Sequence, residues 1–176
     1  QLFGVSQNFM RQTFTPIRGI LNDAFDRIDE LHKNKGQLRG IPTGFPDLDN
    51  LLAGLQKSDL IILAARPSVG KSSLALDIVR HVGVKGKIPV GLFSLEMSKE
   101  QLVDRLLCSE ANVDSWKMRT GRLGERPEDD DFSRIGHAMG VLSEAPIFID
   151  DAPNNNIMQI RTKTRRLQME HGLGLI

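Results

Sequence analysis

Hydrophobic and polar positions predict a helix near the start of the chain. After a polar stretch over residues 1–14, apolar side chains recur every three or four positions from 17 to 31, which is the spacing of an amphipathic helix. Pro16 suits the first turn of a helix, where its missing N–H would have no partner, and Gly36 suits the position after its end. We therefore expect a helix over residues 15–36, followed by a shorter one within residues 45–55.

Short apolar runs alternate with helical patterns through the rest of the chain. The runs cover residues 60–65, 90–95, 147–149 and 173–176. Helical spacing covers residues 72–82, 98–107, 132–142 and 157–170, whereas residues 112–131 show no clear pattern. Ser98 and Gln101 have the spacing of a capping box. Apolar runs without alternation are typical of strands buried on both faces, so the order predicts an α/β fold with a parallel central sheet.

Composition excludes several classes of protein. A chain of 176 residues that is 40% hydrophobic and 26% charged suits one domain with one core, and its net charge of +1 neither favours nor excludes a nucleic-acid partner. The single cysteine excludes an intrachain disulfide, and the four histidines lack metal-ligand spacing. No apolar run approaches the roughly 20 residues that span a bilayer, and no signal peptide is recognisable. We expect a cytoplasmic protein without membrane contact.

Residues 65–72 read A-R-P-S-V-G-K-S between a predicted strand and a predicted helix, which is the setting of a Walker A loop that binds a nucleoside triphosphate. Gly70 would let the backbone approach the phosphates, Lys71 would reach the β- and γ-phosphates, and the Ser72 hydroxyl would ligate Mg²⁺. Ala65 replaces the usual first glycine, which is acceptable if its φ is negative. The plainer interpretation is a strand-to-helix turn with a surface lysine. The candidate nucleotide-binding residues are Ala65, Arg66, Pro67, Ser68, Val69, Gly70, Lys71, Ser72 and Ser73.

Acidic residues follow two of the predicted strands. Ligands bind outside the carboxyl ends of parallel strands, so Glu96 is a candidate for orienting or deprotonating an attacking water, although it could equally be a helix-start charge. Asp150 and Asp151 resemble a Walker B end that holds Mg²⁺ through water, or they form a turn. The competing Walker B strand is the run 173–176, whose acid would lie beyond the end of the chain.

A basic face occupies the last predicted helix, at Arg161, Lys163, Arg165 and Arg166. Such a face could contact nucleic acid, although a solvated helix face is the more common case. No aromatic residue interleaves with these charges and tyrosine is absent, which argues against a base-stacking platform.

Several segments together resemble the bacterial replicative DNA helicases of the DnaB type. The resemblance runs from about Thr13 to Ile176, and the Walker A loop with alanine first and the F-S-L-E-M segment are specific to this family among RecA-like proteins. The segments are G-I-P-T-G-F-P-D-L-D at 40–49, D-L-I-I-L-A-A-R-P-S-V-G-K-S-S at 59–73, F-S-L-E-M-S at 93–98, R-T-G-R-L at 119–123, F-I-D-D at 148–151 and G-L-G-L-I at 172–176.

The resemblance implies a RecA-like P-loop ATPase core over residues 37–176, preceded by a linker helix at 15–36 that packs on a neighbouring subunit, and by a linker end at 1–14. It implies a homo-hexameric ring that uses ATP and Mg²⁺, moves 5′ to 3′ along single-stranded DNA, and meets primase and a helicase loader in the primosome. It assigns Lys71 to the phosphates and makes Glu96 the catalytic glutamate.

The same resemblance places the Walker B aspartate, the arginine finger and the DNA-binding loops after Ile176. Asp150 and Asp151 then remain only secondary candidates for metal binding. We therefore expect a fragment of the motor domain, truncated within a core strand and poorly active alone. Two alternatives stay open, namely another RecA-like ATPase (a recombinase or a KaiC-like protein) and a non-catalytic oligomerisation or interaction module that docks through the stripe at 17–31.

Overall fold

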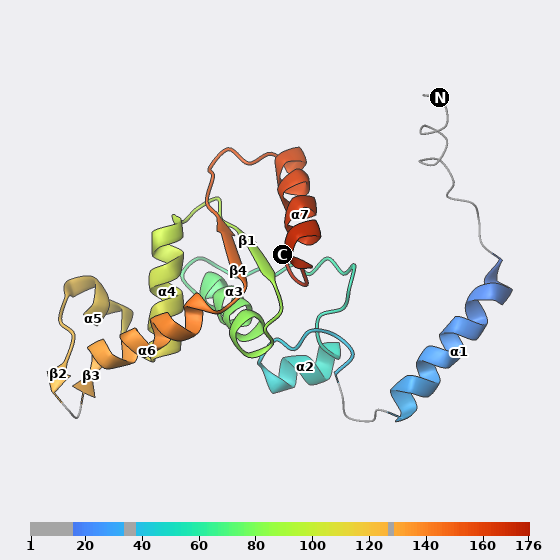
Figure 1. Ribbon diagram of the computed structural model, residues 1–176, viewed down its shortest axis with the longest axis horizontal. Coiled ribbons are helices and arrows are strands. Elements are labelled where there is room, and N and C mark those ends of the chain that lie inside the picture. Colours follow the sequence, from blue (N-terminus) through green and yellow to red (C-terminus); the bar gives the residue numbers. More distant parts are fainter. Residues whose placement is uncertain (1–15, 34–37, 127–128) are drawn as a thin grey trace. The chain divides into compact units, whose positions relative to one another are not determined.

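The computed structural model describes residues 16–33, 38–126 and 129–176 (Figure 1). The chain divides into two compact units, Gln1–Gln37 and Leu38–Ile176. The expected linker end at 1–14 and Gly36 lie outside the described residues.

The described part of the first unit is the helix α1 (Ile17–Lys33), which confirms the predicted amphipathic helix. Five of its apolar side chains are exposed, namely Ile17, Ile20, Leu21, Phe25 and Ile28, with Phe25 at 71% of its maximum. Isolated helices shorter than about 12–15 residues are marginal in water, longer ones gain only modestly, and Gly19 weakens this one further. The apolar stripe of α1 is therefore a surface that needs a packing partner.

A small parallel sheet organises the second unit. Strand β1 (Val90–Phe93) pairs in parallel with β4 (Ile147–Asp150), with Val90 opposite Ile147. On the other edge of β1, the N–H of Gly91 donates to the carbonyl of Leu175 at 2.9 Å, and Val90 forms a parallel bridge to Leu175. The order across the sheet is thus β4, β1 and the run 173–176, which confirms the predicted parallel arrangement for three of the four apolar runs.

The predicted strand at 60–65 is wrong, because this run has no regular secondary structure. Leu60 and Ile62 are 87% and 80% exposed. Both edges of β1 are taken by β4 and Leu175, and no strand among the described residues pairs with 60–65. A sequence suited to a buried strand lacks there the neighbour that would complete its hydrogen bonds.

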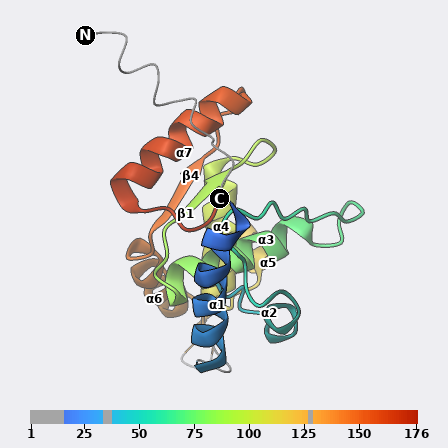
Figure 2. The ribbon, with the colours of Figure 1, turned by 90° about the vertical axis from the view of Figure 1, so that its right-hand side faces the viewer.

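Helices cover both faces of the sheet. The helices α3 (Lys71–Arg80) and α4 (Lys99–Ala111) lie on one face, and α7 (Ile157–His171) lies on the other (Figures 1 and 2). Successive residues of β1 face opposite ways, so Leu92 joins the cluster of α3 and α4 while a side chain at Gly91 would meet Leu167 of α7 at 3.1 Å.

The Ser98 half of the capping box predicted at Ser98 and Gln101 is present, and α7 is capped at both ends. Ser98 accepts from the N–H of Gln101 at the start of α4. Asn156 and Gln159 form a capping box on α7, which ends at Gly172 with a left-handed φ of 71°. A short π-helix, η2 (His81–Lys85), continues α3 beyond its predicted end.

The segment 40–49 packs against the end of α3. The N–H and Oγ1 of buried Thr43 both donate to Asp49 at 2.7 Å, and this holds the turn that begins α2 (Pro46–Leu52). Gly44 has a φ of 89°, and a side chain there would clash with the ring of His81 at 2.5 Å. Glycine is therefore required by backbone conformation and by space.

Residues 112–131, which gave no sequence pattern, form α5 (Ser115–Thr120) and a small antiparallel pair, β2 (Glu125–Arg126) and β3 (Asp129–Asp130). Asp114 caps α5 by accepting from the N–H of Trp116 at 2.7 Å. The next helix, α6 (Asp131–Ser143), packs on α4 through Ala111 and Ala138.

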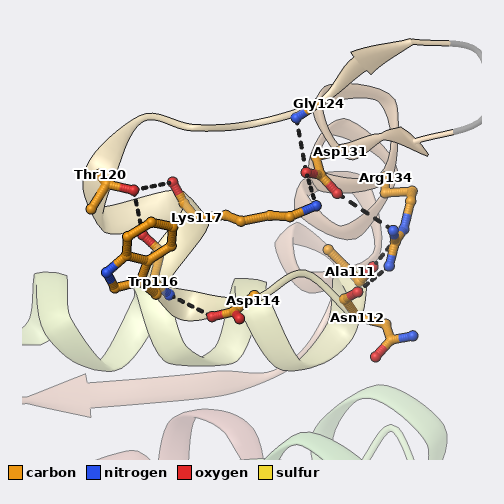
Figure 3. Close-up of polar contacts among 9 residues, drawn as sticks. All are labelled: Ala111, Asn112, Asp114, Trp116, Lys117, Thr120, Gly124, Asp131 and Arg134. Atoms are coloured by element: carbon orange, nitrogen blue, oxygen red, sulfur yellow. Dashed lines mark hydrogen bonds and ion pairs between the residues drawn. The ribbon is translucent and has the colours of Figure 1, made fainter.

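The buried carboxylate of Asp131 links α5, the loop before β2 and the start of α6 (Figure 3). Asp131, 1% exposed, accepts from the N–H of Gly124 at 2.9 Å and from Lys117 at 3.1 Å. Arg134 approaches the same carboxylate at 3.5 Å and donates from Nε to the carbonyl of Ala111 at 3.0 Å. The Gly124 hydrogen bond, with help from Lys117, lowers the pKa of Asp131 although burial opposes the shift.

Asp131→Asn should lower the unfolding temperature at pH 7 by roughly 5 °C, because the ion pairs that Asp131 forms with Lys117 and Arg134 are lost. A carboxyl group with a lowered folded pKa contributes stability above its unfolded pKa of about 3.9, and that contribution disappears as the pH falls through the folded value. The difference from wild type should therefore narrow below about pH 4. Asp130→Asn, at the exposed cap of α6, is the control and should change little. Equal unfolding temperatures at pH 7 would contradict the assignment.

Candidate functional site

The loop 65–70 delivers the backbone into the start of α3. Gly70 is the N-cap, with a φ of 102° that favours glycine, and its carbonyl accepts the first helical hydrogen bond from Leu74 at 2.9 Å. No atom lies within 4 Å of a side chain built at Gly70, so glycine is needed for conformation and not for space. Ser68 also has a positive φ of 65°. The φ of Ala65 is not positive, which is the condition under which alanine can replace the usual first glycine.

Lys71 and Ser72 occupy the first turn of α3. A helix N-terminus presents unpaired N–H groups and a partial positive charge, which suit a phosphate group. Lys71 is exposed and Ser72 half-buried, so both side chains are open to a ligand. The other candidate binding residues are all exposed: Ala65, Arg66, Pro67, Ser68, Val69, Gly70 and Ser73. The donor set therefore fits a nucleotide with its Mg²⁺.

Glu96 lies in the loop 94–98 at the carboxyl end of β1, before α4 begins at Lys99. Its side chain is exposed. The hydroxyl of Ser94 donates to the carbonyl of Met97 at 2.6 Å and accepts from the Met97 N–H at 3.1 Å, so the loop is pinned across Glu96. Met97 also packs on the cluster that contains Leu76 of α3. One apolar cluster thus joins the phosphate-loop helix to the loop of Glu96.

Asp150 and Asp151 lie at the same edge of the sheet as Glu96, since β1 and β4 are parallel. Asp150 accepts from the N–H of Ala152 and from Asn155, both at 3.0 Å, and pairs with Lys163 of α7. The Lys163 contact is the main reason that the pKa of Asp150 falls to about 2. Within the described part of the chain, no group of three or more His, Cys, Asp or Glu side chains could hold a metal ion.

The basic face of α7 is partly occupied by contacts within the chain. Lys163 pairs with Asp150, and Arg166 pairs with Glu170 at 2.8 Å. Arg161 and Arg165 are exposed. Of the four predicted cations, Arg161 and Arg165 therefore form no ion pair with another described residue.

Sequence reasoning missed a groove of about 1050 Å³ between α3, α4 and α5. Its lining is apolar at Leu76, Val113 and Met118 and charged at Asp104 and Arg119. Trp116, the only tryptophan, also lines the groove and is about half exposed. The guanidinium carbon of Arg122 lies 5.2 Å from the centre of its ring, in a cation–π contact. No signal could have revealed the groove, because α5 lies in the stretch without periodicity.

A parallel α/β sheet, a glycine-capped phosphate loop opening a helix, and an acid beyond the next strand define a P-loop nucleotide-binding domain. Residues 40–176 match the family described as DnaB-like helicase C terminal domain, and the chain belongs to that family. The resemblance to bacterial replicative helicases is thereby confirmed.

Two relatives show the extent of the match. The chain is 47% identical to the replicative DNA helicase DnaC of Bacillus subtilis (strain 168), over 98% of its own length and 37% of that protein. It is 48% identical to the replicative DNA helicase DnaB of Geobacillus stearothermophilus, over 100% of its own length and 38% of that protein. The chain therefore spans less than two fifths of the length of these relatives.

Solved structures confirm the RecA-like α/β fold. The ATPase domain of G40P superposes with a TM-score of 0.81 at 26% identity, over 93% of this chain and 56% of that one. A DnaB-like replicative helicase, solved in a study of its interactions with primase, superposes with a TM-score of 0.79 at 26% identity, over 99% of this chain and 40% of that one. None of the described helices is long and apolar enough to cross a membrane.

Proposed function

We propose that the protein containing this chain is a cytoplasmic replicative DNA helicase driven by ATP hydrolysis at the loop 65–73. The observation that carries the proposal is the placement of Lys71 and Ser72 in the first turn of α3, behind a left-handed Gly70. The apolar cluster of Leu76 ties this helix to the loop of Glu96. Family membership supports the same reaction.

Each residue has a distinct role in this proposal. Backbone N–H groups of the loop and the helix N-terminus bind the phosphates, and Lys71 neutralises charge on the β- and γ-phosphates. Ser72 holds Mg²⁺ bound with the nucleotide, and that ion adds further charge neutralisation. Glu96, exposed beyond β1, orients the attacking water and accepts its proton.

Single-stranded DNA, a homo-hexameric ring, primase and a helicase loader are the proposed partners. A structural neighbour studied with primase supports the primase contact. A recombinase or a KaiC-like ATPase is the competing function, since such proteins share the RecA-like fold. Unwinding of a 5′-tailed fork by the complete protein separates them, because strand exchange without unwinding would favour the recombinase.

The exposed stripe of α1 supports assembly into a ring. We propose that α1 docks on a second copy, in the groove between α3, α4 and α5, which offers apolar side chains with charged residues at its margin. The proposal thus keeps the docking role that the interaction-module alternative gave to the stripe at 17–31, and it combines that role with ATP hydrolysis.

Lys71→Ala in the complete protein should lower the rate of ATP hydrolysis at least 10²-fold, because an interaction with the transferring phosphoryl group is lost. Lys85→Ala, an exposed lysine at the far end of the same helical segment, should leave the rate unchanged. Steady-state phosphate release measures both. Normal turnover by the Lys71 variant would place the phosphate site elsewhere.

Glu96→Gln should lower kcat by roughly 10²-fold or more while nucleotide affinity changes little, since the charge acts mainly in the transition state. Glu100→Gln is the matched control, because Glu100 lies in the first turn of α4 and carries the same charge. If Glu96 were only a helix-start charge, the two variants would behave alike. Turnover and equilibrium titration with a fluorescent ATP analogue distinguish these results.

Phe25→Asp should weaken assembly of the complete protein, because it puts a charge in the apolar stripe of α1. Asn22→Asp adds the same charge on the polar face of α1 and should leave assembly intact. Sedimentation velocity measures the mass of each variant, and circular dichroism checks that both are folded. An unchanged mass for the Phe25 variant would exclude α1 from the interface.

A further inference from the structure

We propose that Asp151 is a positioning residue that fixes the loop 94–98 and thereby aims Glu96 at the attacking water. The inference rests on the proposed role of Glu96. The proposal gives a structural role to the I-F-I-D-D segment at 147–151, which resembles the end of a Walker B strand. In this role the segment holds the loop that follows the neighbouring strand β1.

The first contact lies where the loop enters α4. The first N–H groups of a helix have no partner within that helix. Ser98 accepts from the N–H of Gln101 at 3.4 Å, and Asp151 accepts from the N–H of Lys99 at 3.0 Å through Oδ2. The first N–H of α4 is therefore held by the side chain of the residue that follows β4, which is far away in the sequence.

The second contact lies where the loop leaves β1. The N–H of Ser94 donates to the carbonyl of Asp150 at 2.9 Å. Consecutive residues of one chain segment thus hold both ends of the loop that carries Glu96. The side-chain contacts of Ser94 with Met97 close the loop between these ends.

The segment that holds the loop is itself anchored to α7. Asp150 is fixed by the N–H of Ala152, by Asn155 and by Lys163. Its carboxylate is therefore already engaged within the chain, and one oxygen of Asp151 is engaged with Lys99. These contacts favour positioning over metal binding for both aspartates.

Removing the Asp151 carboxylate frees the Lys99 N–H and one end of the loop, so Glu96 should be misplaced while the loop 65–73 is untouched. A displacement of about 1 Å can lower a rate up to 10²-fold. We expect Asp151→Ala to lower kcat about tenfold with nucleotide affinity changed less than twofold. Asp151→Asn keeps an oxygen that accepts from Lys99 and should retain most of kcat.

The experiment compares the complete wild-type protein with Asp151→Ala, Asp151→Asn, Glu96→Gln and the double variant Asp151→Ala/Glu96→Gln. It measures kcat, affinity for a fluorescent ATP analogue, and the Mg²⁺ concentration for half-maximal turnover. If Asp151 acts through Glu96, the double variant should be no slower than Glu96→Gln alone. Asp130→Ala removes a comparable aspartate cap, at α6, and should leave kcat unchanged.

Hydrogen exchange at the amide of Lys99 supplies a readout independent of turnover, and it should speed up in Asp151→Ala and not in Asp151→Asn. An unchanged kcat in Asp151→Ala would overturn the proposal, as would fully additive losses in the double variant. A raised Mg²⁺ requirement in both Asp151 variants would make Asp151 a metal ligand instead. Normal hydrolysis by Glu96→Gln, or none by wild type, would refute the proposed function, while Lys99 exchange would still report on the loop contact.

Discussion

The arrangement depends on one apolar cluster between the phosphate-loop helix and the sheet. Leu76 of α3 packs with Leu102 and Leu106 of α4, and Leu92, Met97 and Ile149 pack against them. Burying each large aliphatic side chain contributes about 1.5–3 kcal/mol. The cluster joins α3 and the strands β1 and β4 to Met97, the residue beside Glu96, so it sets where the loop of Glu96 lies relative to the phosphate loop.

Polar contacts hold the loops and helix ends that this cluster does not reach. Apolar packing is not directional and cannot by itself fix the path of an exposed loop. Hydrogen bonds that Asp150 and Asp151 accept from the N–H groups of Ser94 and Lys99 hold the loop of Glu96, and the buried carboxylate of Asp131 holds α5 and the start of α6. The position of the loop that carries Glu96 and the wall of the groove thus both depend on aspartates as well as on apolar packing.

The sequence allowed accurate prediction where local signals agree with the fold. Ser98 caps the start of α4 as its spacing from Gln101 indicates, and Val90 begins a strand that is buried as its apolar run indicates. The prediction of a strand at 60–65 failed because a strand needs a neighbouring strand to pair with, and the sequence of the run alone does not show whether one is present. The hydrogen bonds that Asp131 accepts from Gly124 and Asp151 accepts from Lys99 could not be predicted, because their donors are backbone N–H groups without a sequence signature.

A structure of the complete protein with Mg²⁺ and a non-hydrolysable ATP analogue tests the central claim most directly, since the claim concerns placement. Lys71 Nζ should lie within hydrogen-bond distance of the terminal phosphate. The Glu96 carboxylate should lie about 2.6–3.2 Å from a water aligned with that phosphate. A Glu96 side chain turned away from the nucleotide, or a nucleotide bound in the groove between α3, α4 and α5, would contradict the account.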